Sequence, residues 1–320
     1  MKKRLTIDSI IEAEKLLQGR IRKTPLEYSK PLSDLLKVPV YLKLECLQKT
    51  GSFKLRGAYY RLFCLSEEER KQGVVTCSAG NHGKAVAYVA KELGIKAVIY
   101  VPRDVDQAKY QGMLEYGAEV VRSPFQGYDD TEEMARQASR EANQTFISPF
   151  DDFEAMAGNG GTLAKEVVEE FPEARSFILP VGGGGLAAGF SFYIKEMGRD
   201  SQIIGCQHQD SPGLKLSLER GYAVTKLPEI ETVAGGIEGG LGANCFEYLK
   251  GRIDQVALVS ESEIISAFRW MLKHHQYLIE PSSAVTLAAC LSGKIGPLNS
   301  STIIIISGRN VSYSTIQILL

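Results

Sequence analysis

Short apolar runs alternate with longer amphipathic stretches along most of this chain of 320 residues. The apolar runs are rich in β-branched residues, which predicts buried strands, while the stretches between them repeat apolar positions at helical spacing. The predicted strands include 74–77, 97–101, 120–121, 177–179, 203–206, 256–259 and 302–306, and the predicted helices include 83–93, 108–116, 129–143, 262–275 and 281–291. This alternation indicates an α/β fold with parallel sheets covered on both faces, in which ligands bind beyond the carboxyl ends of strands.

Charge and composition exclude several classes of function. The 37 Lys and Arg residues nearly balance the 38 Asp and Glu residues, so nothing indicates binding to nucleic acid or an anionic membrane. No apolar run approaches the length of a bilayer span, and no apolar signal core follows the basic start at residues 1–4. The six cysteines form no CxxC pair, which fits reduced thiols. We therefore expect a cytoplasmic protein.

A candidate for covalent catalysis lies in residues 51–57, which read Gly-Ser-Phe-Lys-Leu-Arg-Gly. Lys54 stands there at the start of a predicted helix, after turn-forming residues. A lysine that is desolvated at such a place is neutral near pH 7 and forms a Schiff base with an aldehyde, for which pyridoxal 5′-phosphate is the obvious candidate. Taken alone, Lys54 would most often be a solvated surface charge, so the interpretation depends on three further segments.

The first of these is a run of four glycines after the strand at 177–179. Glycines let backbone N–H groups turn inward, and the helix that follows adds the positive end of its dipole, which together predict a phosphate-binding cup. A flexible linker is the alternative, but the flanking residues are apolar. The residues of the predicted cup are Gly182, Gly183, Gly184, Gly185 and Leu186.

A second interpretation of the same glycines stays open. Residues 183–188 also fit the G-x-G-x-x-A fingerprint of dinucleotide-binding proteins. That fingerprint requires an acidic residue after the next strand, and none occurs here before Asp210. A nucleotide-binding oxidoreductase is therefore a weakened alternative.

The second segment follows the strand at 74–77 and opens a helix; it consists of Ser78, Ala79, Gly80, Asn81 and His82. N–H groups at a helix start can hold a substrate carboxylate, and Asn81 can donate to the phenolic oxygen of the cofactor ring. An ordinary helix start capped by Ser78 or Asn81 is an equally good interpretation of these residues alone. For His82 alone, a structural role is favoured over that of a catalytic base.

The third segment is Ser307 and the residues after it, at the end of the strand at 302–306. A serine hydroxyl can hydrogen-bond the pyridine nitrogen of the cofactor without fully protonating it. A neutral pyridine is a modest electron sink, which favours prompt loss of a β leaving group over transamination. Taken alone, this segment would be interpreted as an ordinary turn after a strand.

Together these four segments resemble the fold-type II pyridoxal-phosphate enzymes, specifically the branch of threonine/serine dehydratases and serine racemases. The resemblance runs through most of the chain and includes residues 24–26, 42–45, 149–152 and 279–282. It implies two three-layer αβα domains with largely parallel, twisted sheets, and a homodimer. The implied large cofactor-binding domain comprises residues 1–68 and 149–320, and the implied small mobile domain comprises residues 69–148.

The resemblance also implies a role for each candidate residue. Lys54 would hold the cofactor as a Schiff base, with Phe53 packed near the ring. Asn81 would contact the ring hydroxyl and Ser307 the pyridine nitrogen. The phosphate would be held by Gly182 to Leu186, and the substrate carboxylate by Ser78 to His82.

Three departures from the family pattern bear on the reaction. Ala79 stands where serine racemases carry a second serine, and a methyl group cannot transfer a proton, so a two-base racemase is disfavoured. Gln207 and Gly213 stand where cation-binding relatives have acidic residues, so we expect no tight divalent metal site. Residues 234–236 read Ala-Gly-Gly where many relatives have Ala-Asp-Gly, and we expect the glycine-rich 237–242 that follow to border the substrate's β-substituent.

The implied reaction is β-elimination of water from a small-molecule substrate, L-threonine or L-serine, to give 2-oxobutyrate or pyruvate and ammonia. An ammonia-lyase for 3-hydroxyaspartate or another hydroxy-amino acid is the first alternative, and a racemase is less favoured. A non-catalytic binding protein on the same fold is a further alternative outside this class.

Overall fold

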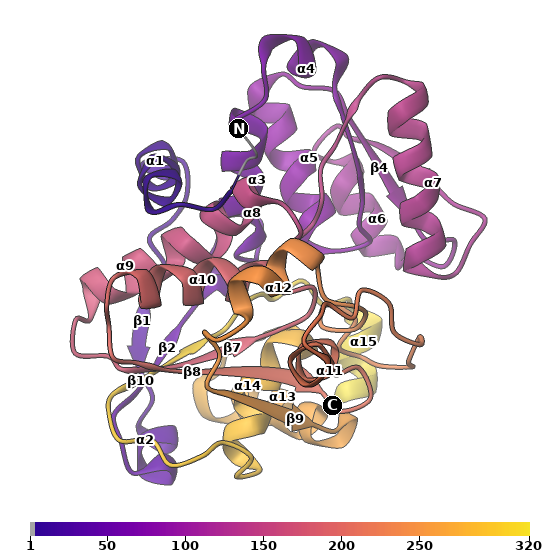
Figure 1. Ribbon diagram of the computed structural model, residues 1–320. Coiled ribbons are helices and arrows are strands. Elements are labelled where there is room, and N and C mark those ends of the chain that lie inside the picture. Colours follow the sequence, from indigo (N-terminus) through magenta and orange to yellow (C-terminus); the bar gives the residue numbers. More distant parts are fainter. Residues whose placement is uncertain (1–3) are drawn as a thin grey trace.

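Two sheets organise this computed structural model, in which residues 4–320 are described and most of the basic start lies outside the described part (Figure 1). The six-stranded sheet has the order β1-β2-β10-β7-β8-β9, and the four-stranded sheet has the order β5-β4-β3-β6. Neighbouring strands are parallel except for the antiparallel pair β1 and β2. The strands are β1 (Leu26–Tyr28), β2 (Val40–Lys43), β3 (Val74–Cys77), β4 (Ala97–Val101), β5 (Glu119–Arg122), β6 (Thr145–Phe146), β7 (Ser176–Pro180), β8 (Gln202–His208), β9 (Gln255–Val259) and β10 (Thr302–Ile305).

Helices connect most of these strands. They are α1 (Ile7–Leu17), α2 (Lys30–Leu36), the 3₁₀ turn η1 (Glu45–Leu47), α3 (Lys54–Phe63), α4 (Glu67–Gln72), α5 (Asn81–Leu93), α6 (Gln107–Leu114), α7 (Tyr128–Glu141), α8 (Phe153–Met156), the π-helical turn η2 (Ala157–Gly161), α9 (Thr162–Glu170), α10 (Gly185–Glu196), α11 (Gly213–Arg220), α12 (Ala243–Leu249), α13 (Glu261–His275), α14 (Pro281–Leu291) and α15 (Tyr313–Leu319). The predicted strands and helices are present, with ends that differ by one or two residues at most positions.

The large sheet has helices on both faces because successive side chains of its strands point to opposite sides. Ile303 and Ile305 belong to a core shared with α1, α9, α10 and α12, while Ile304 and Ile306 belong to a core shared with α2, α13, α14 and α15. In Figure 1, α9, α10 and α12 lie above this sheet, and α13 and α14 lie below it. The predicted α/β fold with parallel sheets covered on both faces is therefore confirmed.

The small sheet is covered in the same way. Val74 and Ile99 pack into a core with α3, α5 and α6, whereas Val75 and Val98 face α7. All four strands lie within the predicted small domain of residues 69–148, but Leu55 and Leu62 of α3 also enter its core. The domain boundaries and the mobility of the small unit remain predictions.

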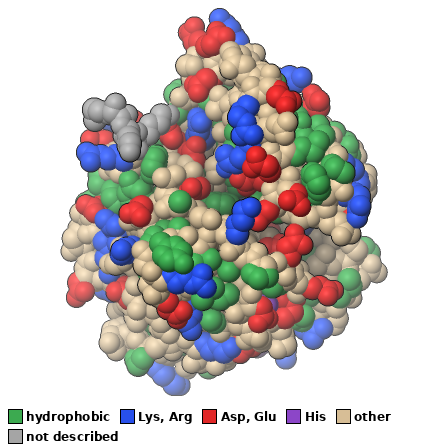
Figure 2. Space-filling model, turned by 45° about the vertical axis from the view of Figure 1, so that its right-hand side comes forward, with side chains coloured by type: hydrophobic (Ala, Val, Ile, Leu, Met, Phe, Trp, Pro, Cys, Tyr) green, Lys and Arg blue, Asp and Glu red, His purple; other side chains and the backbone are tan. Residues whose placement is uncertain are grey.

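The distribution of charge over the surface and the length of the helices bear on the partners that the protein can have. Over the face drawn in Figure 2, Lys and Arg side chains are interspersed with Asp and Glu, and no broad patch of one sign forms. Within residues 4–320, no helix combines the length and the apolar character needed to cross a lipid bilayer.

Candidate active site

Loops from both sheets line a single cavity of about 560 Å³. The contributing segments include the start of α3, the β3–α5 and β7–α10 loops, and the loop after β10. Every residue proposed from the sequence lines this cavity: Phe53, Lys54, Ser78, Ala79, Gly80, Asn81, His82, Gly182, Gly183, Gly184, Gly185, Leu186 and Ser307. Long-range folding therefore brings together segments that are up to about 250 residues apart, as expected for a ligand site at strand ends.

Lys54 is the first residue of α3 and its side-chain amine lies inside the protein. The chain reverses just before it at Gly51, whose φ of 82° is a left-handed conformation that suits glycine. Lys54 Nζ donates a hydrogen bond to the Pro149 carbonyl oxygen at 2.6 Å and lies 5.2 Å from the centroid of the Phe53 ring. Burial lowers the pKa of Lys54 from 10.5 to about 8, so a larger share of the amine is neutral and nucleophilic near pH 7.

The glycine run leaves no room for side chains. A Cβ on Gly182 would lie 2.7 Å from the Gly236 carbonyl oxygen, one on Gly183 would overlap the Phe150 ring, and one on Gly185 would lie 2.7 Å from the Phe150 carbonyl oxygen. Gly184, with φ of 97°, precedes α10, and no side chain caps that helix. The cup therefore presents backbone N–H groups and a helix start, which suits a phosphate group.

The start of α5 also lacks a side-chain cap. Gly80 is the N-cap residue, and no side chain accepts from the first turn of this helix. Ser78 Oγ instead accepts from the Gly80 N–H at 3.2 Å, and the Asn81 side chain is turned to other partners. The interpretation in which Ser78 or Asn81 caps the helix is therefore wrong, and the N–H groups of the first turn are available to an anion.

Asn81 belongs to a chain of polar contacts that crosses the cavity. Its Nδ2 donates to both carboxylate oxygens of Glu280 at 2.7 and 2.9 Å, and its Oδ1 accepts from Asn310 Nδ2 at 2.6 Å. Asn310 Nδ2 also donates to the Thr50 carbonyl oxygen, and Asn310 Oδ1 accepts from Lys84 Nζ at 3.0 Å. These contacts determine which end of the Asn81 amide faces Glu280.

Two buried groups near Lys54 have shifted ionisation. Burial raises the pKa of Glu280 to about 7, although the hydrogen bond from Asn81 acts in the opposite direction. Burial and then the nearby Lys54 charge lower the pKa of His82 to about 3. His82 is thus a neutral imidazole at pH 7, which agrees with the structural role favoured for it.

Ser307 is positioned by a second serine. The hydroxyl oxygens of Ser307 and Ser283 are 2.8 Å apart, and Ser283 Oγ also accepts from the Gly308 N–H at 2.6 Å. The single proton of Ser283 can be donated to Ser307 or to the Gly308 carbonyl oxygen. When it goes to Ser307, the Ser307 proton is available for a ligand atom such as a pyridine nitrogen.

The groups around the cavity match those of pyridoxal phosphate one by one. A partly neutral lysine suits the aldehyde, a cup of backbone N–H groups suits the phosphate, and a neutral hydroxyl suits the pyridine nitrogen. A family model described as "Pyridoxal-phosphate dependent enzyme" matches residues 17–308. The chain belongs to this family. Membership decides against the nucleotide-binding oxidoreductase suggested by residues 183–188.

Individual relatives extend the family assignment to nearly the whole chain. An L-threonine ammonia-lyase of Geobacter sulfurreducens is 37% identical over 311 residues, covering 97% of this chain and 77% of the relative. The catabolic L-threonine dehydratase TdcB of Escherichia coli K12 is 35% identical over 316 residues, covering 98% and 95%. The solved structure of maize serine racemase is 31% identical with a TM-score of 0.92, and covers 98% of this chain and 96% of that one.

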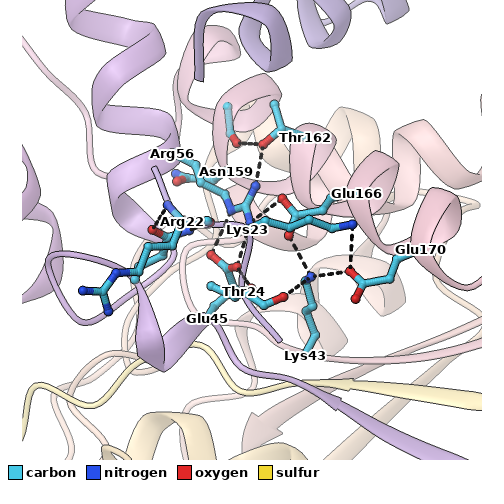
Figure 3. A network of polar contacts seen from close by, with 12 residues as sticks. Arg22, Lys23, Thr24, Lys43, Glu45, Arg56, Asn159, Thr162, Glu166 and Glu170 are labelled. Carbon is cyan, nitrogen blue, oxygen red and sulfur yellow. Dashed lines mark hydrogen bonds and ion pairs between the residues drawn. The ribbon is translucent and has the colours of Figure 1, made fainter. Parts of the chain in front are cut away.

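A buried network of charged side chains supports α3 and hence Lys54 (Figure 3). Arg56 makes two hydrogen bonds of 2.8 Å to the carboxylate of Glu45 and one of 2.9 Å to Glu166. Lys43 Nζ lies 2.7 Å from Glu166 and 3.1 Å from Glu170. Because Arg56 is two residues from Lys54, this network fixes the position of the helix start that carries the amine.

The sequence did not identify every residue that shapes the cavity. Nothing in the sequence alone gives a role to Glu280 or Asn310, or singles out Lys109 and Glu238, although all four line the cavity. Glu280 directly precedes Pro281 at the start of α14, which is a recognisable N-cap position, but no local pattern predicts that it meets Asn81.

At the position considered for a metal, Gln207 is buried and has protein partners. Its Oε1 accepts from the Leu214 and Lys215 N–H groups at 3.0 and 3.2 Å, and its Nε2 donates to the Val181 carbonyl oxygen at 3.3 Å. Among the side chains that the structure describes, no group of three or more His, Cys, Asp or Glu residues is arranged to hold a metal ion.

Proposed function

We propose that this pyridoxal-phosphate enzyme eliminates water from L-threonine, and from L-serine, to release 2-oxobutyrate or pyruvate and ammonia. The observation that carries the proposal is the convergence of the buried amine of Lys54, the glycine cup and the α5 start on one cavity. The two relatives named as a threonine ammonia-lyase and a threonine dehydratase support this substrate.

The roles of the individual residues follow from their chemistry. Bound pyridoxal phosphate supplies an electron sink that makes the Cα proton of an amino acid acidic. The glycine cup and the α5 start hold two anionic groups at fixed positions, which orients the Cα–H bond. The neutral amine of Lys54 would accept the Cα proton, and this proton balances the one that the departing β-hydroxyl takes up to leave as water. Hydrolysis of the released enamine then gives the 2-oxo acid and ammonia.

The same cavity argues against racemisation. Inverting Cα requires a second group that delivers a proton to the face opposite Lys54. Ala79 lines the cavity at the position proposed for that group, and its methyl cannot serve. We therefore favour elimination, although the chain also resembles maize serine racemase.

We also propose that residues 69–148 close over the substrate, and that the enzyme is a cytoplasmic homodimer. No disulfide joins the six cysteines, which supports a reducing compartment. Light scattering would test the dimer directly, since a monomeric mass at micromolar concentration would contradict it.

The deciding experiment is an assay of 2-oxo acid release with added pyridoxal phosphate. L-Threonine, L-serine, D-serine and both 3-hydroxyaspartate diastereomers would be offered to the wild type, to Lys54→Ala and to Lys71→Ala, which removes an exposed lysine of α4. We expect 2-oxobutyrate from L-threonine, none from Lys54→Ala, and unchanged rates from Lys71→Ala. If oxaloacetate forms from a hydroxyaspartate and no 2-oxobutyrate forms from threonine, a hydroxyaspartate is the substrate instead of threonine. Turnover by Lys54→Ala would refute the mechanism.

A further inference from the structure

The glycine-rich segment 233–239 forms the wall of the cavity next to the phosphate cup. Its Gly236 N–H donates to Ser282 Oγ at 2.9 Å, and the Gly236 carbonyl oxygen lies against Gly182. Six residues of the segment line the cavity: Val233, Gly235, Gly236, Ile237, Glu238 and Gly239. Since the cup and the α5 start are assigned to the two anionic groups, this wall is left to face the substrate's β-substituent.

Glu238 is the charged residue of this wall, and its side chain folds back over Gly235. The Glu238 Oε1 atom lies 3.3 Å from the point where a Cβ on Gly235 would stand. The departure from Ala-Asp-Gly at residue 235 therefore does not remove negative charge from this place, because a carboxylate is supplied from three residues further along. Within residues 4–320, no hydrogen bond or ion pair engages the Glu238 carboxylate.

The surroundings of Glu238 are acidic. The charged residues that line the cavity comprise four carboxyl groups and two amines, namely Asp129, Glu229, Glu238 and Glu280 against Lys54 and Lys109. Glu238 is exposed, yet the cavity wall removes part of its water; this partial desolvation and the neighbouring Glu229 raise its pKa, and Lys109 opposes the shift. One lysine thus faces two carboxylates on the β-side of the cavity, while Lys54 is engaged with the cofactor.

We propose that Glu238 is a specificity-determining residue, and that the site accepts amino acids whose β-substituent is neutral or cationic and rejects those that carry a second carboxylate. This rests on the proposed function, which it deepens by separating hydroxy-amino acids such as threonine and serine from the hydroxyaspartates. The physical reason is like-charge repulsion: a β-carboxylate would enter beside Glu238 and Glu229 with only Lys109 to balance them.

Binding of two unreactive amino acids would test this without requiring elimination. L-2-Aminobutyrate has the carbon skeleton of threonine and L-aspartate carries a second carboxylate, and neither has a β-hydroxyl to lose. Their dissociation constants would be measured from the absorption change of the bound cofactor in the wild type, Glu238→Gln, Glu238→Lys and the control Glu231→Gln. Glu231 is an exposed carboxylate of the same loop outside the cavity lining.

We expect the wild type to bind L-2-aminobutyrate at least about tenfold more tightly than L-aspartate, because a nearby like charge repels the second carboxylate even in a partly screened site. Glu238→Gln should narrow this ratio about tenfold, Glu238→Lys should narrow it further, and Glu231→Gln should leave it unchanged. The proposal would be overturned if the wild type bound L-aspartate more tightly than L-2-aminobutyrate. It would also be overturned if the ratio of the two dissociation constants in Glu238→Gln and Glu238→Lys stayed within twofold of the wild-type ratio.

The two proposals fail in distinguishable ways. If the wild type releases no 2-oxobutyrate from L-threonine but the binding ratio shifts in the Glu238 variants, the proposed function is wrong and the role of Glu238 stands. If 2-oxobutyrate is released and the ratio does not move, Glu238 does not determine specificity. If Glu231→Gln shifted the binding ratio as much as Glu238→Gln does, the specificity role of Glu238 would also be rejected, because the shift would then be a general effect of surface charge.

Discussion

Burial sets the ionisation of Lys54, His82 and Glu280, which all line the cavity. A buried group avoids its charged form, so the pKa values of the two bases fall and that of the acid rises. The result at neutral pH is a lysine that is partly neutral, a histidine that carries no charge, and a carboxyl group near its midpoint. We therefore expect the rate of cofactor capture to depend on pH through Lys54, and the stability of the cofactor-free protein to depend on pH through Glu280.

Capture of the cofactor should follow the ionisation of Lys54. Only the neutral amine attacks an aldehyde, so in the cofactor-free protein the capture rate should rise with pH and reach half its maximum near pH 8. Stopped-flow absorption after mixing with pyridoxal phosphate would measure it. Lys71→Ala should behave as the wild type, and a rate that still climbs between pH 9 and 10.5 would contradict a lowered pKa.

Stability of the cofactor-free protein should fall as Glu280 ionises. Its pKa is raised from 4.5 to about 7 on folding, so its stabilising contribution is fully present below pH 4.5 and is lost as pH rises through 7. The contribution at stake is up to about 3 kcal/mol. Urea unfolding at several pH values should show that Glu280→Gln lacks this part of the pH dependence.

An exposed carboxyl provides the control for that measurement. Glu219→Gln on α11 should keep the wild-type slope between pH 4.5 and 7, because Glu219 is largely in water. Identical slopes in the wild type and Glu280→Gln would mean that Glu280 ionises normally.

Helices and turns hold these residues in place, and here α3 and the β7–α10 loop matter most. The start of α3 depends on the buried network of Arg56, because a charged side chain that is 1% exposed requires its partners. The β7–α10 loop depends on the absence of side chains at its glycines. One element is thus held by ion pairs and the other by close backbone packing.

Arg56→Ala should destabilise the protein strongly. It would leave Glu45 buried without its partner, which typically costs about 3–5 kcal/mol of the free energy of unfolding. Arg140→Ala, which removes an exposed ion pair with Glu133, should cost less than about 1 kcal/mol. Denaturant unfolding would compare them, and similar losses in both variants would show that the buried network adds little.

Gly182→Ala should weaken cofactor binding. Its methyl would approach the Gly236 carbonyl oxygen to 2.7 Å, so the cup and the wall at 233–239 would have to separate. We expect the dissociation constant of pyridoxal phosphate to rise at least about tenfold, equivalent to about 1.4 kcal/mol. Gly112→Ala on α6 has open space around its Cβ and should bind as the wild type does; equal binding by Gly182→Ala would contradict the tight packing of the cup.

On the scale of the whole molecule, the polar chain from Lys84 to Glu280 joins the two sheets. Lys84 and Asn81 belong to α5 beside the small sheet, while Glu280 precedes α14 and Asn310 follows β10 of the large sheet. The chain runs across the cavity where the two units meet. Its contacts therefore couple the orientation of Asn81 to the relative position of the units.

Asn310→Ala should loosen this junction. It removes the donor to Asn81 and the acceptor for Lys84, so the first turn of α5 loses restraints that reach across the cavity. Hydrogen exchange measured by mass spectrometry should become several times faster at residues 79–84. Asn299→Ala, at an exposed position before β10, should leave exchange there unchanged, and unchanged exchange in Asn310→Ala would show that the junction is held elsewhere.

Local sequence was sufficient for the α/β class and for most of the strands, and it singled out Lys54 and the glycine run as candidates, because periodicity and glycine runs are properties of neighbouring residues. The short strands β1, β2 and β6 were not predicted from it. The same local reasoning could not choose between a capped helix start and an anion site at the start of α5. Only the folded chain shows that the Asn81 side chain is turned to Glu280. The lowered pKa of Lys54, the network of Arg56 and the carboxylate of Glu238 over Gly235 also depend on tertiary structure. Burial and charge pairing arise between segments far apart in the chain, so they exist only once the two sheets have packed together.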